Sequence, residues 1–158
     1  MRIVEYGLEL DEDMVGKLIK ENTKNCPNIH NEFLNNPQKI SNIFRMAFQL
    51  EKKAEEYLYL VAMDAKCKAI GFFEISHGTS NASLASPKSI YQRALLCGAT
   101  NIVVVHNHPS GCTEPSSADI EMAKNLKKAG ALLDINLVDS VIIGGDEYYS
   151  FKEHGIVF

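Results

Sequence analysis

The spacing of apolar and polar residues changes several times along the chain, and each change marks an expected element. Residues 2–6 have the pattern of a short strand, and residues 10–21 repeat apolar side chains at the spacing of a helix. Residues 22–36 are polar and rich in asparagine, which favours a loop. We therefore interpret residues 1–36 as an N-terminal extension made of a strand, a helix and an asparagine-rich loop.

A stronger helical pattern begins at Pro37. Apolar residues recur at helical spacing as far as Phe48, and the expected helix then continues through charged turns to Glu56. Residues 57–64 and 69–75 follow as two apolar stretches of strand length, separated by a short polar turn. This arrangement predicts a β-hairpin directly after the helix.

The C-terminal half alternates between helix and strand patterns. Ser86 and Pro87 supply an N-cap and a first-turn proline for a helix that ends near Gly98. A second helix is expected from Ser116 to about Lys128, with Gly130 as its stop. Strands are expected between and after these helices, at 102–105, 133–138, 140–143 and 147–151, with a tight turn at 144–147. The mixture predicts the α/β class, with a mixed central β-sheet flanked by helices.

Composition and charge narrow the function classes. The 158 residues are 46% hydrophobic and 23% charged, which is enough apolar material for one packed core. The net charge of −4 and the pI of about 5.7 lack the strong positive charge typical of a dedicated DNA-binding domain. The four cysteines form no Cys-x-x-Cys pair, and neither a signal peptide nor a membrane-length apolar run occurs. We expect a cytoplasmic protein with reduced thiols and no membrane attachment.

Two histidines directly follow the apolar strand 102–105. Because residues i and i+2 of an extended chain point to the same side, His106 and His108 can direct both imidazoles at one point. Ligand sites of α/β sheets collect where loops leave the ends of strands. On this feature alone, a metal-binding pair and a solvated loop pair are equally good interpretations.

Asp119 adds a carboxylate near the start of the next helix. It shares a helix face with the apolar residues Met122, Ala123 and Leu126, so its charge needs a compensating partner, which a cation would provide. The alternative is structural, since Ser116 and Asp119 also match a capping box at a helix N-terminus. Two imidazoles and one carboxylate with an open fourth position are a common catalytic zinc set. Ser116 lies close enough in sequence to donate a hydrogen bond to an oxyanion there.

These residues together carry a family resemblance. The spacing of His106, His108, Pro109, Ser116 and Asp119 resembles the JAMM motif of the MPN metalloproteases. The string His106-Asn-His-Pro-Ser-Gly111, the Glu-Pro-Ser that follows, and Gly78-Thr79, Val138-Asp139 and Tyr149-Ser-Phe151 resemble more narrowly the RadC-like branch. The resemblance covers roughly residues 40 to 158, and we expect a RadC-like JAMM/MPN domain over residues 37–158.

The resemblance implies an MPN/JAB architecture related to cytidine deaminases, and a zinc ion held by His106, His108 and Asp119. It also implies a glutamate on an earlier strand that acts as general base and acid, and by its position before Gly78-Thr79 this residue is expected to be Glu74. Ser140 departs from the pattern, because RadC-like chains usually have histidine there. The N-terminal helix-hairpin-helix region of longer family members is not expected in residues 1–36.

Three functions follow in order of preference. The first is a zinc-dependent hydrolase that cuts an amide, peptide or isopeptide bond of a peptide or protein substrate, with Glu74 and Ser116 as catalytic residues. The second is a RadC-like module of DNA repair or of a mobile element that binds metal without peptidase activity, which leaves nucleic-acid binding open. The third is a zinc-dependent deaminase, which the absence of a Pro-Cys-x-x-Cys motif disfavours.

Overall fold

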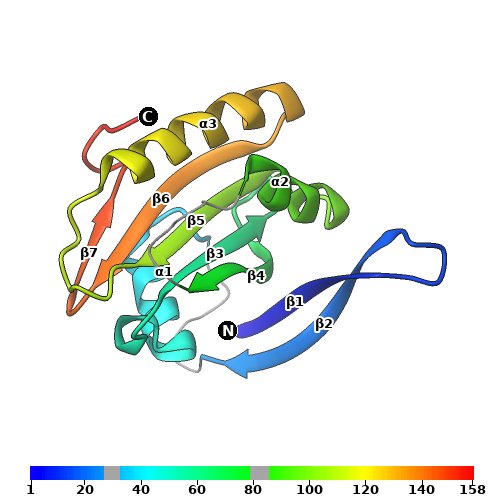
Figure 1. The fold of residues 1–158 in the computed structure, drawn as a ribbon, viewed down its shortest axis with the longest axis horizontal. Coiled ribbons are helices and arrows are strands. Elements are labelled where there is room, and N and C mark those ends of the chain that lie inside the picture. Colours follow the sequence, from blue (N-terminus) through cyan, green and yellow to red (C-terminus); the bar gives the residue numbers. More distant parts are fainter. Residues whose placement is uncertain (27–32, 79–85) are drawn as a thin grey trace.

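A mixed β-sheet organises the molecule (Figure 1). The computed structural model describes residues 1–26, 33–78 and 86–158. Within these ranges seven strands form one sheet in the order β2-β1-β4-β3-β5-β6-β7, in which β1 pairs parallel with β4 and β5 with β6, and the other neighbours are antiparallel. The strands are β1 (Arg2–Leu10), β2 (Gly16–Asn25), β3 (Glu56–Met63), β4 (Ala69–Gly78), β5 (Asn101–Asn107), β6 (Asn136–Gly144) and β7 (Glu147–Ser150).

Helical segments cover both faces of the sheet and confirm the expected α/β class. One face packs against α2 (Pro87–Leu96) and α3 (Ser117–Leu133), with Ile90, Met122 and Leu126 in its core. The other face packs against α1 (Pro37–Ile43), a π-helical turn (Phe44–Phe48) and a 3₁₀ turn (Leu50–Lys52). We call these the α2/α3 face and the α1 face. Strand β5 is buried along its whole length because it is covered on both.

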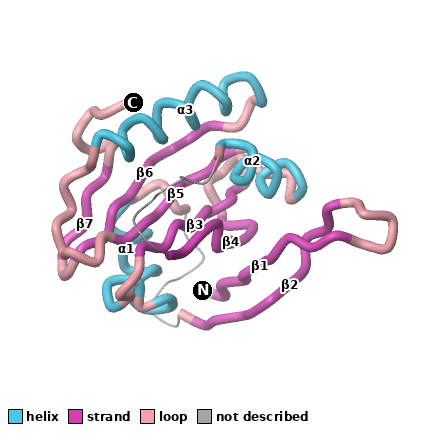
Figure 2. Tube along the Cα trace, viewed as in Figure 1, coloured by secondary structure: helices cyan, strands magenta, loops and turns pink. Residues whose placement is uncertain are grey.

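The helix expected over residues 10–21 is wrong. The chain forms a β-hairpin of β1 and β2, which extends away from the rest of the sheet (Figure 2). Its turn is closed by Asp11, whose Oδ1 accepts hydrogen bonds from the backbone N–H groups of Asp13 and Val15. Residues 16–25 pair antiparallel with β1, which pairs in turn with β4, and this strand pairing outweighs the helical spacing of the apolar residues. The asparagine-rich loop starts later than expected, because residues 22–25 belong to β2, and residues 27–32 lie outside the described residues.

The helix that begins at Pro37 ends before the charged turns. Gln49 adopts left-handed backbone angles, with φ of 49°, and Lys53 is extended. Phe48 and Leu50 are both buried in the α1 face. Side chains two positions apart point about 200° apart on an α-helix, so an uninterrupted helix could not bury both. The break frees residues 53–56 to lead into the sheet, and Glu56 becomes the first residue of β3.

Helix α3 is longer than expected and contains Gly130 in its last turn. A Cβ atom on Gly130 would lie 2.5 Å from the hydroxyl oxygen of Tyr91 and 2.3 Å from the carbonyl oxygen of Ile135. Glycine therefore allows α2 and the start of β6 to approach α3 closely, and Asp134 ends the helix in a left-handed conformation. The two strands expected at 133–138 and 140–143 are one strand, β6, with a register irregularity opposite Ile102 and Val103.

The C-terminal hairpin of β6 and β7 agrees with the expected strand at 147–151 and the turn before it. No helix within the described ranges is long and apolar enough to cross a membrane.

Candidate metal centre

The end of β5 places both histidines of the motif. His106 is 1% exposed and continues the ladder with β3 and β6, opposite Leu58 and Ile142. The Nε2 atoms of His106 and His108 lie 3.1 Å apart. His108 is held beyond the strand by its backbone N–H, which donates to Ile143, and by its Nδ1, which lies 2.7 Å from the carbonyl oxygen of Cys112. A carbonyl oxygen only accepts, so Nδ1 carries a hydrogen, and in the neutral ring Nε2 presents its lone pair to the cluster.

Asp119 faces the two imidazoles from the first turn of α3. Its Oδ1 lies 3.2 Å from His106 Nε2, and its Oδ2 lies 3.6 Å from His108 Nε2. The backbone N–H and the hydroxyl of Ser116 both donate to Oδ2, at 2.7 and 2.6 Å, and the backbone N–H of Asp119 donates back to Ser116 Oγ. The capping box is therefore present, and it orients the carboxylate toward the histidines. The structural and the metal interpretation of this pair are compatible.

Opposing charges set the protonation of these groups. Burial alone would raise the pKa of Asp119, but hydrogen bonds with His106, His108 and Ser116 hold that pKa far below its usual range. In the protonated ring the Nε2–H faces Asp119, and this hydrogen bond raises the pKa of His108 against the opposite effect of its burial. The carboxylate is thus ionised in a place where it is 4% exposed, and it needs positive charge beside it.

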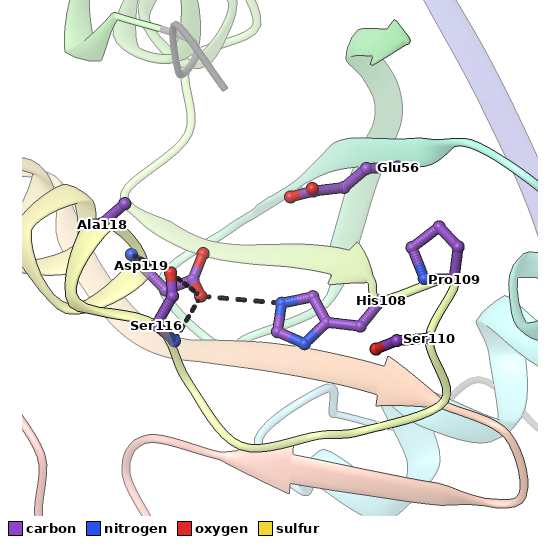
Figure 3. A pocket seen from close by; sticks show the side chains of 7 residues that line it. All are labelled: Glu56, His108, Pro109, Ser110, Ser116, Ala118 and Asp119. Atoms are coloured by element: carbon purple, nitrogen blue, oxygen red, sulfur yellow. Dashed lines mark hydrogen bonds and ion pairs between the residues drawn. The ribbon is translucent and has the colours of Figure 1, made fainter. Parts of the chain in front are cut away.

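Glu56 is the fourth member of the cluster. One ligand atom from each of Glu56, His106, His108 and Asp119 lies within 4.8 Å of the others, and the four could hold a metal ion. Figure 3 shows Glu56 on the wall of a pocket, across from His108 and Asp119. The rest of the wall is formed by short side chains, namely Pro109, Ser110, Ser116 and Ala118. The pocket is therefore only partly enclosed by the protein.

Glu74, the glutamate expected to act as the base, lies outside this group of four residues. Glu74 Oε2 accepts a hydrogen bond from the hydroxyl of Tyr59 at 2.9 Å, and Oε1 lies 2.7 Å from Nδ1 of His77. Burial, reinforced by the charge of Glu74, raises the pKa of the Tyr59 hydroxyl well above its ordinary value. That hydroxyl therefore stays protonated and donates to Glu74.

Strand alternation explains why Glu56 and not Glu74 reaches the histidines. Leu58 packs in the α2/α3 face and pairs with His106, so Glu56, two residues earlier on β3, points to that face. Tyr59 packs in the α1 face, and its bond to Glu74 places that carboxylate on the α1 face as well. The signal in the sequence was the spacing Glu56-x-Leu58-x-Leu60, which continues the apolar face of β3 by one polar position.

The donor set fits a small divalent ion. Two ligand atoms about 2.0–2.1 Å from a tetrahedral zinc ion lie roughly 3.3–3.4 Å apart. The distances of 3.1 Å between the two Nε2 atoms and 3.2 Å from His106 Nε2 to Asp119 Oδ1 are close to that value. The side chains of His106, His108 and Asp119 converge here, and a cation between them would stabilise this arrangement.

Ser140 and Gly78, two positions of the family resemblance, and Cys112, which follows the histidines, lie outside the group of four. Cys112 is an exposed free thiol outside the cluster, and it contributes its carbonyl oxygen to His108. Ser140 is fully buried, and its hydroxyl has no hydrogen-bond partner among the residues that the structure describes. Gly78 ends β4 with φ of 125°, and Thr79 lies outside the described residues.

A mixed sheet with a His/His/Asp/Glu cluster at a strand end defines an α/β protein whose candidate metal site resembles that of the JAMM proteins. Residues 34–156 match the RadC-like JAB domain family, and the chain belongs to this family.

Its relatives are UPF0758 proteins. That of Chlorobaculum parvum is 36% identical over 112 residues, which cover 71% of this chain and 50% of the relative. That of Chlorobium phaeovibrioides is 39% identical over 109 residues, 69% of this chain and 49% of the relative. That of Thermotoga maritima is 33% identical over 130 residues, 80% of this chain and 59% of the relative. The chain thus spans about half the length of the curated relatives it matches.

Proposed function

We propose that this protein is a zinc-dependent hydrolase that cuts an amide, peptide or isopeptide bond of a peptide or protein substrate. The observation that carries the proposal is the convergence of Glu56 with His106, His108 and Asp119 within 4.8 Å. His106, His108 and Asp119 would hold the ion and leave a fourth position open. A zinc ion held in this way lowers the pKa of a coordinated water to about 7 and polarises a carbonyl group.

Glu56 takes the role that the family pattern gives to a glutamate on an earlier strand. It accepts a proton from the attacking water and later delivers this proton to the leaving nitrogen, so the products are a carboxylic acid and an amine. Its place on the pocket wall, across from His108, supports this role. Glu74 is hydrogen-bonded to Tyr59 and His77 on the α1 face. This position does not suit the role of general base at the histidines.

Ser116 would act on the opposite side of the scissile group. Its hydroxyl borders the pocket and donates to Asp119 Oδ2 in this structure. We propose that it also turns this hydrogen toward the carbonyl oxygen of a bound substrate as negative charge develops there. In the free protein the same hydroxyl orients Asp119.

The test is a cleavage profile on a library of peptides derived from a bacterial proteome, read by mass spectrometry. Protein loaded with one equivalent of zinc should produce new peptide termini, and metal-free protein and His108→Ala should produce none. Lysine-linked peptides in a parallel pool report isopeptide cleavage. His154→Ala is the matched control, because His154 stacks on Tyr149 away from the cluster.

Cleavage that persists without metal, or equally in His108→Ala, would contradict the proposal. An absence of cleavage in zinc-loaded wild type, together with salt-dependent binding of duplex DNA, would favour the second function, that of a metal-binding module without peptidase activity.

A further inference from the structure

Asn107, the residue between the two histidines, is 1% exposed. It is the last residue of β5, and by strand alternation its side chain points to the face opposite His106, away from the cluster. A buried amide must find partners for one acceptor and two donor positions. Among the described residues, its side-chain partners are Lys53, Glu55 and Tyr57, which lie just before and at the start of β3.

The amide of Asn107 holds the two peptide groups on either side of Glu56. Its Oδ1 accepts from the backbone N–H of Tyr57 at 2.8 Å, and its Nδ2 donates to the carbonyl oxygen of Glu55 at 3.0 Å. Nδ2 also lies 3.5 Å from the carbonyl oxygen of Lys53. The Cα atom of Glu56 lies between the first two of these peptide groups, so both backbone torsions of Glu56 are restrained by one side chain.

These hydrogen bonds of the Asn107 side chain, which we call the clamp, begin where the backbone pairing of β3 with β5 ends. The last paired residues between β3 and β5 are Leu58 and His106, so Glu56 has no backbone partner on the strand that carries the histidines. The Asn107 side chain extends the connection by two residues. Aspartate would keep the acceptor for Tyr57 but lose the donors, and alanine would leave the groups on both sides of Glu56 without their partner.

We propose that Asn107 is a positioning residue, which fixes the carboxylate of Glu56 over the two histidines from the opposite face of the sheet. The inference rests on the proposed function of Glu56. It explains why asparagine stands between the histidines of this motif: one tripeptide supplies two ligand side chains on one face and the anchor of the general base on the other. Misplacement of a catalytic group by about 1 Å can lower the rate about a hundredfold.

The experiment compares Asn107→Ala and Asn107→Asp with Asn101→Ala in the full chain. Asn101 lies at the other end of β5, and its Nδ2 donates to the carbonyl oxygen of Asp64 at 2.8 Å, so its loss perturbs the same strand without touching Glu56. Zinc content, amide exchange of Glu56 and Tyr57 by NMR, and kcat and KM on a peptide from the cleavage profile are measured for each.

In Asn107→Ala we expect about one zinc per chain, kcat lowered roughly ten- to a hundredfold with KM within about twofold, and faster exchange of the Tyr57 amide. Asn107→Asp should keep the Tyr57 amide protected and still lose kcat, which tests the clamp even if the alanine variant folds poorly. Asn101→Ala should match wild type in all three measurements. The further loss of kcat on adding Asn107→Ala to Glu56→Gln should be small, because both act through one carboxylate.

Wild-type exchange of the Tyr57 amide in Asn107→Ala would overturn the inference, as would an equal loss of kcat in Asn101→Ala. If wild type cleaves nothing, the proposed function fails, and the exchange measurements still decide the clamp by themselves. Loss of Tyr57 protection in Asn107→Ala, with protection kept in Asn107→Asp and Asn101→Ala, then supports it, and unchanged protection in Asn107→Ala rejects it.

Discussion

Glu56 and Glu74 lie on neighbouring strands, β3 and β4, and direct their carboxylates to opposite faces of the sheet. Glu56 lies with His106 of β5 on the α2/α3 face, and Glu74 binds Tyr59 and His77 on the α1 face. Only one of the two carboxylates can therefore exchange a proton with a group between His106 and His108. The two residues form a natural pair of test and control.

Glu56→Gln keeps the size of the side chain and removes the base. We expect turnover to fall about a hundredfold or more, with zinc retained, because Glu56 is not needed as a ligand. Glu74→Gln should change turnover less than about threefold, since it alters only the contact with Tyr59 and His77. Steady-state rates and zinc content of the two variants check this. A reversed order of the two effects would return the catalytic role to Glu74.

The distance along the chain explains which parts of the site could be predicted from the sequence. His106, His108, Ser116 and Asp119 lie within 14 residues, and local rules of strand alternation and helix capping bring them together. Glu56 comes from a segment 50 residues before His106, and its place depends on the break at Gln49 and on the pairing of β3 with β5.

The same reasoning applies to the fold. The buried strand β5 and the start of α3 carry strong local signals, and the structure confirms both. The hairpin of β1 and β2 does not, because its partially exposed strands have apolar residues at a spacing that also suits a helix. Residues 16–25 pair with β1, and β1 joins the sheet through Glu5 and Phe72, which are far apart in sequence, so the local spacing does not contain this pairing.

Ser116→Ala removes the hydroxyl that receives the Asp119 N–H and donates to Asp119 Oδ2. We expect a loss of about 1 kcal/mol in the free energy of unfolding from the cap. Zinc affinity should fall roughly ten- to a hundredfold, because the carboxylate loses its orienting partner. Urea unfolding of the metal-free protein and competition with a chelator measure the two effects. Ser116→Thr keeps the hydroxyl and should stay near wild type in both, and equal zinc affinity in the alanine variant would refute the orienting role.

Asp139, which is not part of the metal cluster, should make the free energy of unfolding depend on pH. Burial raises the pKa of this carboxyl above its ordinary value, although Ser150, Lys152 and Ser140 donate hydrogen bonds to it. A raised folded-state pKa stabilises the fold below the unfolded value of about 3.9, and this contribution is lost as pH rises through the folded pKa.

Urea unfolding of wild type and Asp139→Asn from pH 4 to 7 tests this sign. The free energy of unfolding of wild type should decline relative to that of the variant as pH rises. The total decline is about 1.4 kcal/mol for each tenfold by which folding increases the proton affinity of the Asp139 carboxylate. A difference that grows in favour of wild type with rising pH would mean that the hydrogen bonds to Asp139 outweigh its burial.

The most direct test of the account is anomalous diffraction at the zinc absorption edge from crystals of zinc-loaded protein. We predict one peak per chain, bounded by His106 Nε2, His108 Nε2 and Asp119 Oδ1 at about 2.0–2.2 Å, with the Glu56 carboxylate nearby but outside bonding distance. The same crystals of His108→Ala should lose most of the peak. A peak elsewhere in the chain, or none between these three residues in zinc-loaded crystals, would contradict the metal centre and the hydrolase proposed on it.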